Sequence, residues 1–198
     1  SQGSPRMESK VALQVSAAQG PIARAFTSSL KLQVDALEGL IGSTDLATYD
    51  GIEVKVGDDH LVIPYRVHYE GSEESGKSLT GVQRTMYACL LTRHHDGHVR
   101  QRELQRILMV AEPWVVPFVF QLTGEYVIEI LNTCEAHLHE LDPVLYGTFI
   151  RENPRYFQAT RDRMISYWDC CYRWQYPRKT DYVGFRIFER FQEFASGF

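Results

Sequence analysis

The stretch TRHHDGHVRQRELQRIL, residues 92–108, decides the fold because it has the features of a junction between two helices. Asp96 occupies a position where a side chain can cap the N-terminus of a helix, and the apolar residues after it recur at helical spacing. Upstream, Thr80 and Gln83 have the spacing of a capping box, which predicts the start of the preceding helix. We therefore expect two consecutive helices that meet near Asp96, in a mostly helical protein.

The same stretch contains three histidines and an aspartate, a composition that can bind a metal or perform acid–base catalysis. These residues are His94, His95, Asp96 and His98. Adjacent histidines cannot face one point on a regular helix, and the spacing of zinc-binding helices is missing. We expect no metal, no cofactor and no catalytic residue here: Asp96 caps the second helix, and Arg93 or Arg100 bonds its carboxylate or nearby carbonyls. The alternative is a small enzyme that uses the four residues, with or without a metal and assisted by Glu125.

Residues 114–139 form the most apolar of the expected helices, and we predict one central helix that is buried over most of its circumference. Glu125 and Glu129 lie one turn apart on its narrow polar stripe. We interpret these acids as solvated or paired with arginines, because a catalytic pair needs a cleft and a raised pKa that the sequence does not indicate. Capping residues predict the starts of three further helices at Asp142, Asn153 and Asp181.

The segment DGHVRQRELQRIL, followed by PWVVPFVFQLTGEYVIEIL, resembles one HEAT-type helix pair. The resemblance covers Asp96–Leu131 and rests on Asp96, Val99 and Arg100 at the start of one helix, before a second and more apolar helix. It implies a helix hairpin and a platform that binds other proteins. It assigns no functional residue.

The sequence GIEVKVGDDHLVIPYRVHYE, residues 51–70, predicts a β-hairpin, because apolar and polar residues alternate on both sides of a turn at 57–59. Pro64 makes the second arm an edge strand or a bulge, since proline cannot donate to a strand ladder. Upstream, residues 30–41 fit both a strand and a helix. The expected fold class is α+β and mostly α: a small N-terminal β-hairpin lobe, then a bundle of five or six helices with the HEAT-like pair.

Composition predicts how the chain is divided. Residues 1–6 are expected to be a cloning remnant before a natural start at Met7, residues 7–76 an acidic N-terminal lobe with the hairpin, and residues 77–198 the helical region of one continuous globular domain. No apolar run approaches the roughly 20 residues that span a bilayer, and the start lacks a secretion signal. We therefore expect a cytoplasmic protein with no membrane partner.

The segment YWDCCYRWQYPRK, residues 167–179, combines aromatic, basic and cysteine residues. Such a run can stack nucleic-acid bases, but Trp168, Cys171 and Trp174 fall on a plausible core stripe, so we expect core packing. Cys170 and Cys171 are expected to point about 100° apart on a helix, which disfavours a disulfide or a shared metal. All four cysteines are expected to be free thiols.

Acidic residues concentrate between residues 35 and 76, where ten acids accompany two bases, Lys55 and Arg66, so that the formal charge is −8. The whole chain carries −4, so the acidity belongs to this region. We expect no nucleic-acid partner and favour a basic protein. The predicted partner-binding residues are Asp45, Asp50, Glu53, Asp58, Asp59, Glu70, Glu73 and Glu74.

The sequence has no glycine-rich phosphate loop and no nucleophile-elbow motif. It therefore predicts a non-enzymatic protein-binding module. The most specific hypothesis is a bacterial immunity protein that neutralises a cognate toxin by occluding a basic active site, because an acidic inhibitor complements such a cleft. An adaptor or structural subunit shares these features and differs only in its partner.

Overall fold

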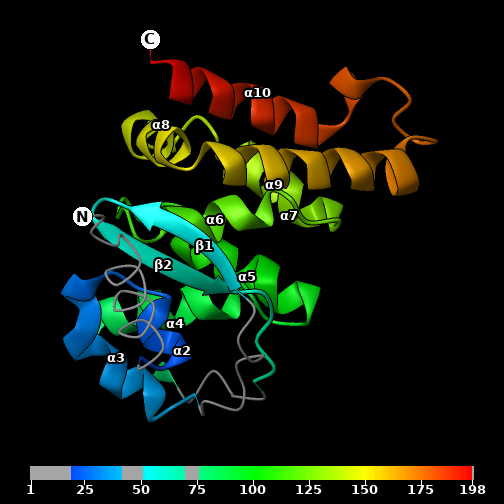
Figure 1. Ribbon diagram of the computed structural model, residues 1–198. Coiled ribbons are helices and arrows are strands. Elements are labelled where there is room, and N and C mark those ends of the chain that lie inside the picture. Colours follow the sequence, from blue (N-terminus) through cyan, green and yellow to red (C-terminus); the bar gives the residue numbers. More distant parts are fainter. Residues whose placement is uncertain (1–18, 42–50, 70–75, 198) are drawn as a thin grey trace, which may run out of the picture.

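The computed structural model describes residues 19–41, 51–69 and 76–197 and shows a mostly helical α+β fold with one β-hairpin, which confirms the predicted fold class (Figure 1). The α-helices are α2 (Pro21–Arg24), α3 (Lys31–Glu38), α4 (Gly81–Leu91), α5 (Gly97–Ile107), α6 (Val116–Leu122), α7 (Ile128–Ala136), α8 (Pro143–Glu152), α9 (Pro154–Tyr167) and α10 (Val183–Ser196). The strands are β1 (Gly51–Val56) and β2 (Asp59–Pro64). The short helical segments of the described residues are η1 (Ser28–Leu30), the π-helical η3 (Trp168–Tyr172) and η4 (Lys179–Asp181).

The hairpin forms as its sequence pattern predicts. Strands β1 and β2 pair antiparallel, with Val56 opposite Asp59 at the turn and Gly51 opposite Pro64 at the other end. Gly57 in the turn has a φ of 60°, a left-handed conformation that glycine adopts without steric cost. The apolar residues of the alternating pattern are buried in the core, except Tyr65, which is exposed. Glu53 and Lys55, between the buried residues of β1, face outward.

The open choice for residues 30–41 is resolved in favour of a helix, α3. Its buried residues are Val34 and Leu37, three positions apart, as expected for one face of a helix. With α2 and the hairpin, α3 completes the N-terminal part of the fold.

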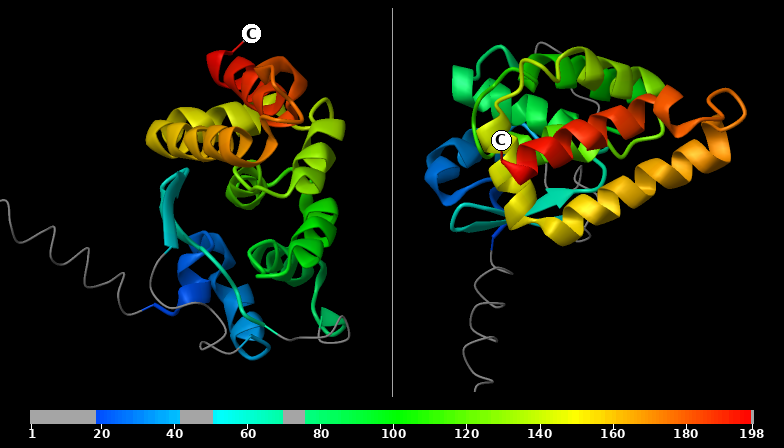
Figure 2. Two further views of the ribbon diagram at one scale, coloured as in Figure 1. Left: turned by 90° about the vertical axis from the view of Figure 1, so that its right-hand side faces the viewer. Right: turned by 90° about the horizontal axis from the view of Figure 1, so that it is seen from above.

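Helices α8, α9 and α10 lie together at one end of the molecule and α2 to α4 lie at the other, with the hairpin between them (Figure 1). The segment that joins α9 to α10 projects beyond the rest of the protein in two views (Figures 1 and 2). Buried apolar residues from Ile22 to Phe194 belong to one cluster, so the N-terminal and helical regions share a core.

The core is largely aromatic at the end formed by α8 to α10. Phe120 of α6 is fully buried, and its ring contacts five other aromatic rings at centroid distances between 5.2 and 5.9 Å. These rings belong to Phe149, Tyr156, Phe157, Phe188 and Phe191. Such edge and tilted contacts add to the burial energy of each ring.

Two predictions about the helices are wrong. The single central helix expected at 114–139 is divided into α6 and α7, so that α4 to α10 comprise seven α-helices instead of five or six. The last helix begins at Val183, after the short η4 that contains Asp181, instead of at Asp181 itself. The HEAT-type resemblance of Asp96–Leu131 stays a prediction.

The remaining helices begin where the sequence predicts, and the predicted caps form at all of them except α9. Thr80 and Gln83 form a capping box on α4, and Asp142 accepts hydrogen bonds from two backbone N–H groups at the start of α8. Helix α9 begins at Pro154 as expected, but the Asn153 side chain does not cap it. That side chain binds the hairpin instead, through Lys55.

Candidate functional site

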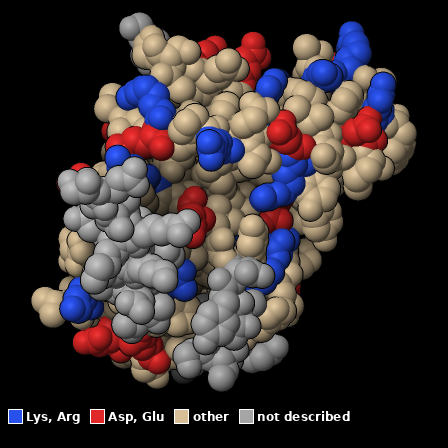
Figure 3. All heavy atoms as spheres, viewed as in Figure 1, with Lys and Arg blue, Asp and Glu red and all other residues tan. Residues whose placement is uncertain are grey.

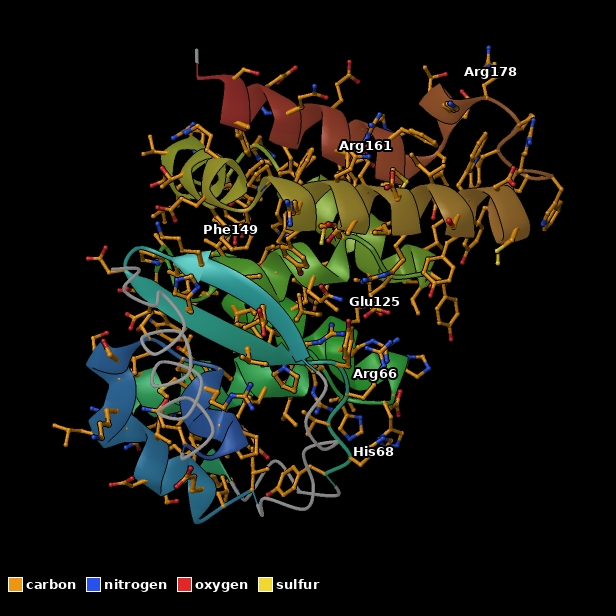
Figure 4. The ribbon with its side chains drawn as sticks, in the orientation of Figure 1. Arg66, His68, Glu125, Phe149, Arg161 and Arg178 are labelled. Carbon is orange, nitrogen blue, oxygen red and sulfur yellow. The ribbon has the colours of Figure 1, made fainter. Side chains whose placement is uncertain are left out.

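Glu125 lies between α6 and α7, and three arginines surround its carboxylate. Nη1 and Nη2 of Arg66 donate to the two carboxylate oxygens at 3.1 and 3.2 Å, and Figure 4 shows the two side chains next to each other. Nη1 of Arg93 donates to Oε1 at 3.2 Å, and Nη2 of Arg100 lies 3.7 Å from Oε2. Only 6% of the Glu125 side chain is exposed. We call these four residues the arginine cluster.

The arginines of this cluster come from the ends of different elements. Arg66 follows β2, Arg93 follows α4, and Arg100 stands near the start of α5. The Arg93 guanidinium also donates to the carbonyls of Pro64 and Tyr65 at 3.2 and 3.0 Å. The cluster therefore connects the end of the hairpin to the helices, and its bidentate and charge-assisted bonds fix their relative positions.

The electrostatics of the cluster are dominated by burial and by an excess of positive charge. Burial by itself raises the pKa of Glu125, but the charges of Arg93, Arg66 and Arg100 and the hydrogen bonds from Arg66 outweigh it, so that this pKa lies below its ordinary value. Burial lowers the pKa of Arg93 to about 10. The negative charge of Glu125 opposes this shift, and the positive charge of Arg66 contributes to it. Three cations thus share one carboxylate.

The RHHDGH segment is a helix–helix junction, as predicted, and its polar groups bind the surrounding backbone. Asp96 Oδ1 accepts from the N–H of His98 at 2.8 Å and caps α5. The His94 ring uses both nitrogens: Nδ1 accepts from the N–H of Asp96 at 3.0 Å, and Nε2 lies 3.0 Å from the carbonyl oxygen of Tyr69. Arg100 Nη1 donates to two carbonyls of the junction at 2.8 and 2.9 Å.

The four residues considered for metal binding or catalysis do not converge on one point. His94 is buried, whereas His95, Asp96 and His98 are exposed. The His95 ring stacks between the rings of His94 and His68, at centroid distances of 4.2 and 5.2 Å. Within residues 19–41, 51–69 and 76–197, no group of three or more His, Cys, Asp or Glu residues could hold a metal ion. The side chains of His94 and Asp96 support the junction through their hydrogen bonds.

Glu125 and Glu129 do not lie one turn apart on a single helix, as the sequence predicted, because the chain leaves the helix between Leu122 and Ile128. Glu129 is exposed on α7, and Glu125 is buried. The predicted pairing of these acids with arginine is found at Glu125. No local signal identifies Arg66 as a partner, since it is 59 residues away in the chain.

Three of the eight predicted partner-binding acids lie on the hairpin. Glu53 faces outward from β1, Asp58 is exposed in the turn, and Asp59 accepts a hydrogen bond from the Ser28 hydroxyl at 3.3 Å. The other five fall outside the described residues: Asp45, Asp50, Glu70, Glu73 and Glu74. The outer face of β1 is not uniformly acidic, because Lys55 is exposed two residues after Glu53.

A cavity of about 240 Å³ opens beside the arginine cluster, between the end of the hairpin and α9. Its lining residues are Tyr65, Arg66, Arg93, Gln121, Gly124, Glu125, Arg163 and Tyr167. On this face of the molecule, basic groups lie above and below an acidic patch to the right of the centre (Figure 3). Sequence reasoning missed this cavity, because its residues come from four separate parts of the chain.

The segment after α9 differs from its prediction. Trp168 is buried as expected, and its Nε1–H donates to the carbonyl of Tyr176 at 2.9 Å, but Cys171 and Trp174 are exposed. The Sγ atoms of Cys170 and Cys171 lie 2.8 Å apart, so the expected divergence of these side chains is wrong. Both cysteines lie in the π-helical η3 instead of the regular α-helix on which the prediction was based.

Comparisons with protein-family models, curated proteins and solved structures found no significant match. No helix in the described part of the chain is both long and apolar enough to cross a membrane.

Proposed function

We propose that this protein is a non-enzymatic binding module that docks on a basic protein partner through its acidic hairpin. The observation that carries the proposal is the outward position of Glu53 and Asp58 on a hairpin whose inner face is anchored in the core. In its most specific form, the module is an inhibitor of the immunity-protein type that covers the basic active site of a bacterial toxin.

Rigid presentation of the acids supports binding, because a preorganised surface loses less entropy when a partner docks. Both main-chain polar groups of Lys55 bind the Asn153 side chain, which fixes β1 against the α8–α9 corner. The arginine cluster fixes the other end of the hairpin, beyond β2. Asp58 and Glu53 are thus carried by an element that is held at both ends.

The titratable side chains of the junction and of the arginine cluster are engaged in contacts within the protein, which supports binding in preference to catalysis. Glu125 is engaged by three arginines, both His94 nitrogens contact the backbone, and Asp96 caps α5. A general base needs an accessible lone pair within reach of a substrate proton. The lone pairs of these groups are instead used in contacts that stabilise the fold.

Charge defines the class of partner. The formal charge of −8 between residues 35 and 76 accelerates encounter with a basic surface and disfavours an acidic one. Toxins that act on nucleic acids or nucleotides carry basic clefts, so they are the favoured partners. An adaptor role would use the same surface with a different basic protein.

The test begins with capture of the partner from the source organism, its identification by mass spectrometry and its purification. Binding is then measured by titration calorimetry for the wild type and for the double variant Glu53→Lys/Asp58→Lys. We expect the Kd to rise at least tenfold, with a basic surface on the partner.

The control is Glu112→Lys/Glu189→Lys, which changes the net charge equally at two exposed acids outside the hairpin. It should alter the Kd by less than about threefold. Equal weakening by both double variants would show that net charge acts without a hairpin site. No weakening by either would refute the proposal.

A further inference from the structure

The cavity beside the arginine cluster has an unbalanced charge. Among its lining residues, Arg66, Arg93 and Arg163 carry three positive charges and Glu125 carries one negative charge, so the net formal charge is +2. Partly buried cations that lack a counter-charge are costly, and an anion that enters removes this cost. The cavity therefore has the electrostatics of an anion-binding site.

Hydrogen-bond donors remain available at the mouth of the cavity. Arg66 uses its guanidinium in three hydrogen bonds, one to the Tyr65 carbonyl and two to Glu125, and a guanidinium has five N–H donors. Within the described residues, Arg163 forms no hydrogen bond or ion pair. The side chains of Arg163 and Arg66 therefore face the cavity with N–H groups to donate.

Aromatic side chains complete the site. Tyr65 and Tyr167 line the cavity, and their hydroxyl groups make no hydrogen bond within the described residues. A buried anchor is also present, since Arg93 is 1% exposed and its guanidinium is held by carbonyls and by Glu125. A ligand would thus meet fixed cations at the base and adjustable donors at the mouth.

We propose that this cavity binds a phosphate group, with Arg163 and Arg66 as its principal ligands. A phosphate near pH 7 carries about 1.5 to 2 negative charges, which matches the net charge of the lining residues better than the single charge of a carboxylate does. Its several oxygens accept from both guanidinium groups and from the tyrosine hydroxyls at once. This site is separate from the acidic hairpin, and the inference does not depend on the proposed function.

The experiment measures binding of inorganic phosphate to the full chain by titration calorimetry at constant ionic strength. We expect saturable binding at one site per chain, and at least tenfold weaker binding by Arg163→Gln. Because Arg163 holds no other part of the structure, this variant should keep the wild-type circular dichroism spectrum and thermal midpoint.

Two control variants locate the site. Arg155→Gln removes an exposed arginine of the same helix that does not line the cavity. Arg84→Gln alters a second basic hollow, between α4 and α5, which also contains Arg102 and Arg106. Both controls should bind phosphate as the wild type does. Loss of binding in Arg84→Gln, or equal binding in Arg163→Gln and wild type, would overturn the proposal.

Two further ligands define the chemistry. Glycerol 3-phosphate should compete with inorganic phosphate for the site. Tighter binding of this ester than of inorganic phosphate would indicate that the natural ligand is an organic phosphate. Equal binding of the two would indicate that free phosphate is sufficient. Acetate should bind at least tenfold more weakly than phosphate. Equal binding of acetate and phosphate would contradict a phosphate site.

Discussion

Asn153 and Lys55 are 98 residues apart and bind each other through two hydrogen bonds, from the Lys55 N–H to Asn153 Oδ1 at 2.7 Å and from Asn153 Nδ2 to the Lys55 carbonyl at 2.8 Å. An amide side chain can satisfy both because it carries a donor and an acceptor. The amide also donates to the Phe149 carbonyl at 2.8 Å. One side chain thus joins the edge of β1 to the corner between α8 and α9.

Substitution Asn153→Ala should lower the free energy of unfolding by about 1–3 kcal/mol, because it leaves the N–H and the carbonyl of Lys55 without these partners. Urea unfolding gives the stability, and hydrogen exchange at the Lys55 amide gives the local effect. Asn153→Asp should be intermediate at most, since a carboxylate can accept from the N–H but cannot donate to the carbonyl. Wild-type stability and exchange in both variants would contradict this account.

Glu125 should be among the most sensitive positions in the protein. Glu125→Gln and Glu125→Ala leave Arg93 buried without its counter-charge, and we expect a loss of about 3–5 kcal/mol in the free energy of unfolding. Arg66→Gln should cost less, about 1 kcal/mol, because 35% of the Arg66 side chain is exposed and solvent screens its charge. Urea unfolding at pH 7 compares the three variants, and an equal loss in Arg66→Gln and Glu125→Gln would be inconsistent with this ranking.

The pH dependence of stability should identify the same carboxylate. The folded-state pKa of Glu125 lies below its ordinary value of 4.5, so the folded state binds a proton less readily than the unfolded state. Its contribution is present above pH 4.5 and is lost as the pH falls through the lower, folded-state pKa. The difference in stability between wild type and Glu125→Gln should therefore narrow below pH 4.5. A constant difference between pH 7 and pH 3 would argue against an ionised Glu125.

Gly147 should be required for the contact between α8 and α10. A Cβ atom at this position would lie 2.2 Å from the Phe194 carbonyl oxygen, a distance that forces the two helices apart. We expect Gly147→Ala to cost about 1–3 kcal/mol of stability. The matched control is Gly81→Ala at the start of α4, where a Cβ would meet nothing within 4 Å, and where we expect no loss or a gain of about 0.4–1 kcal/mol. Thermal or urea unfolding should separate the two variants, and equal stability would contradict the close approach.

Features that depend on neighbouring residues were predictable from the sequence. Thr80, Asp96 and Asp142 cap their helices through bonds to the next two or three residues, and Gly57 forms the hairpin turn. Such contacts are encoded locally, so a short pattern is enough to recognise them.

Features that depend on distant contacts were not predictable. Apolar residues continue at helical spacing through Leu122 and Ile130, so periodicity alone indicates one helix where the structure has two. Glu125 lies in the break and is held there by arginines from three other segments. The same convergence creates the cavity that Arg163 lines, and nothing in the residues around Arg163 reveals it.

The most direct test of the proposed function compares two single variants on the same strand, Glu53→Lys and Lys55→Glu, in binding to the captured partner. Both side chains are exposed on the outer face of β1, and the changes have opposite signs. The hairpin account predicts that Glu53→Lys weakens binding, that Lys55→Glu strengthens it, and that high salt reduces the difference. Changes in the same direction, or affinities equal to that of the wild type, would contradict docking of a basic partner on this hairpin.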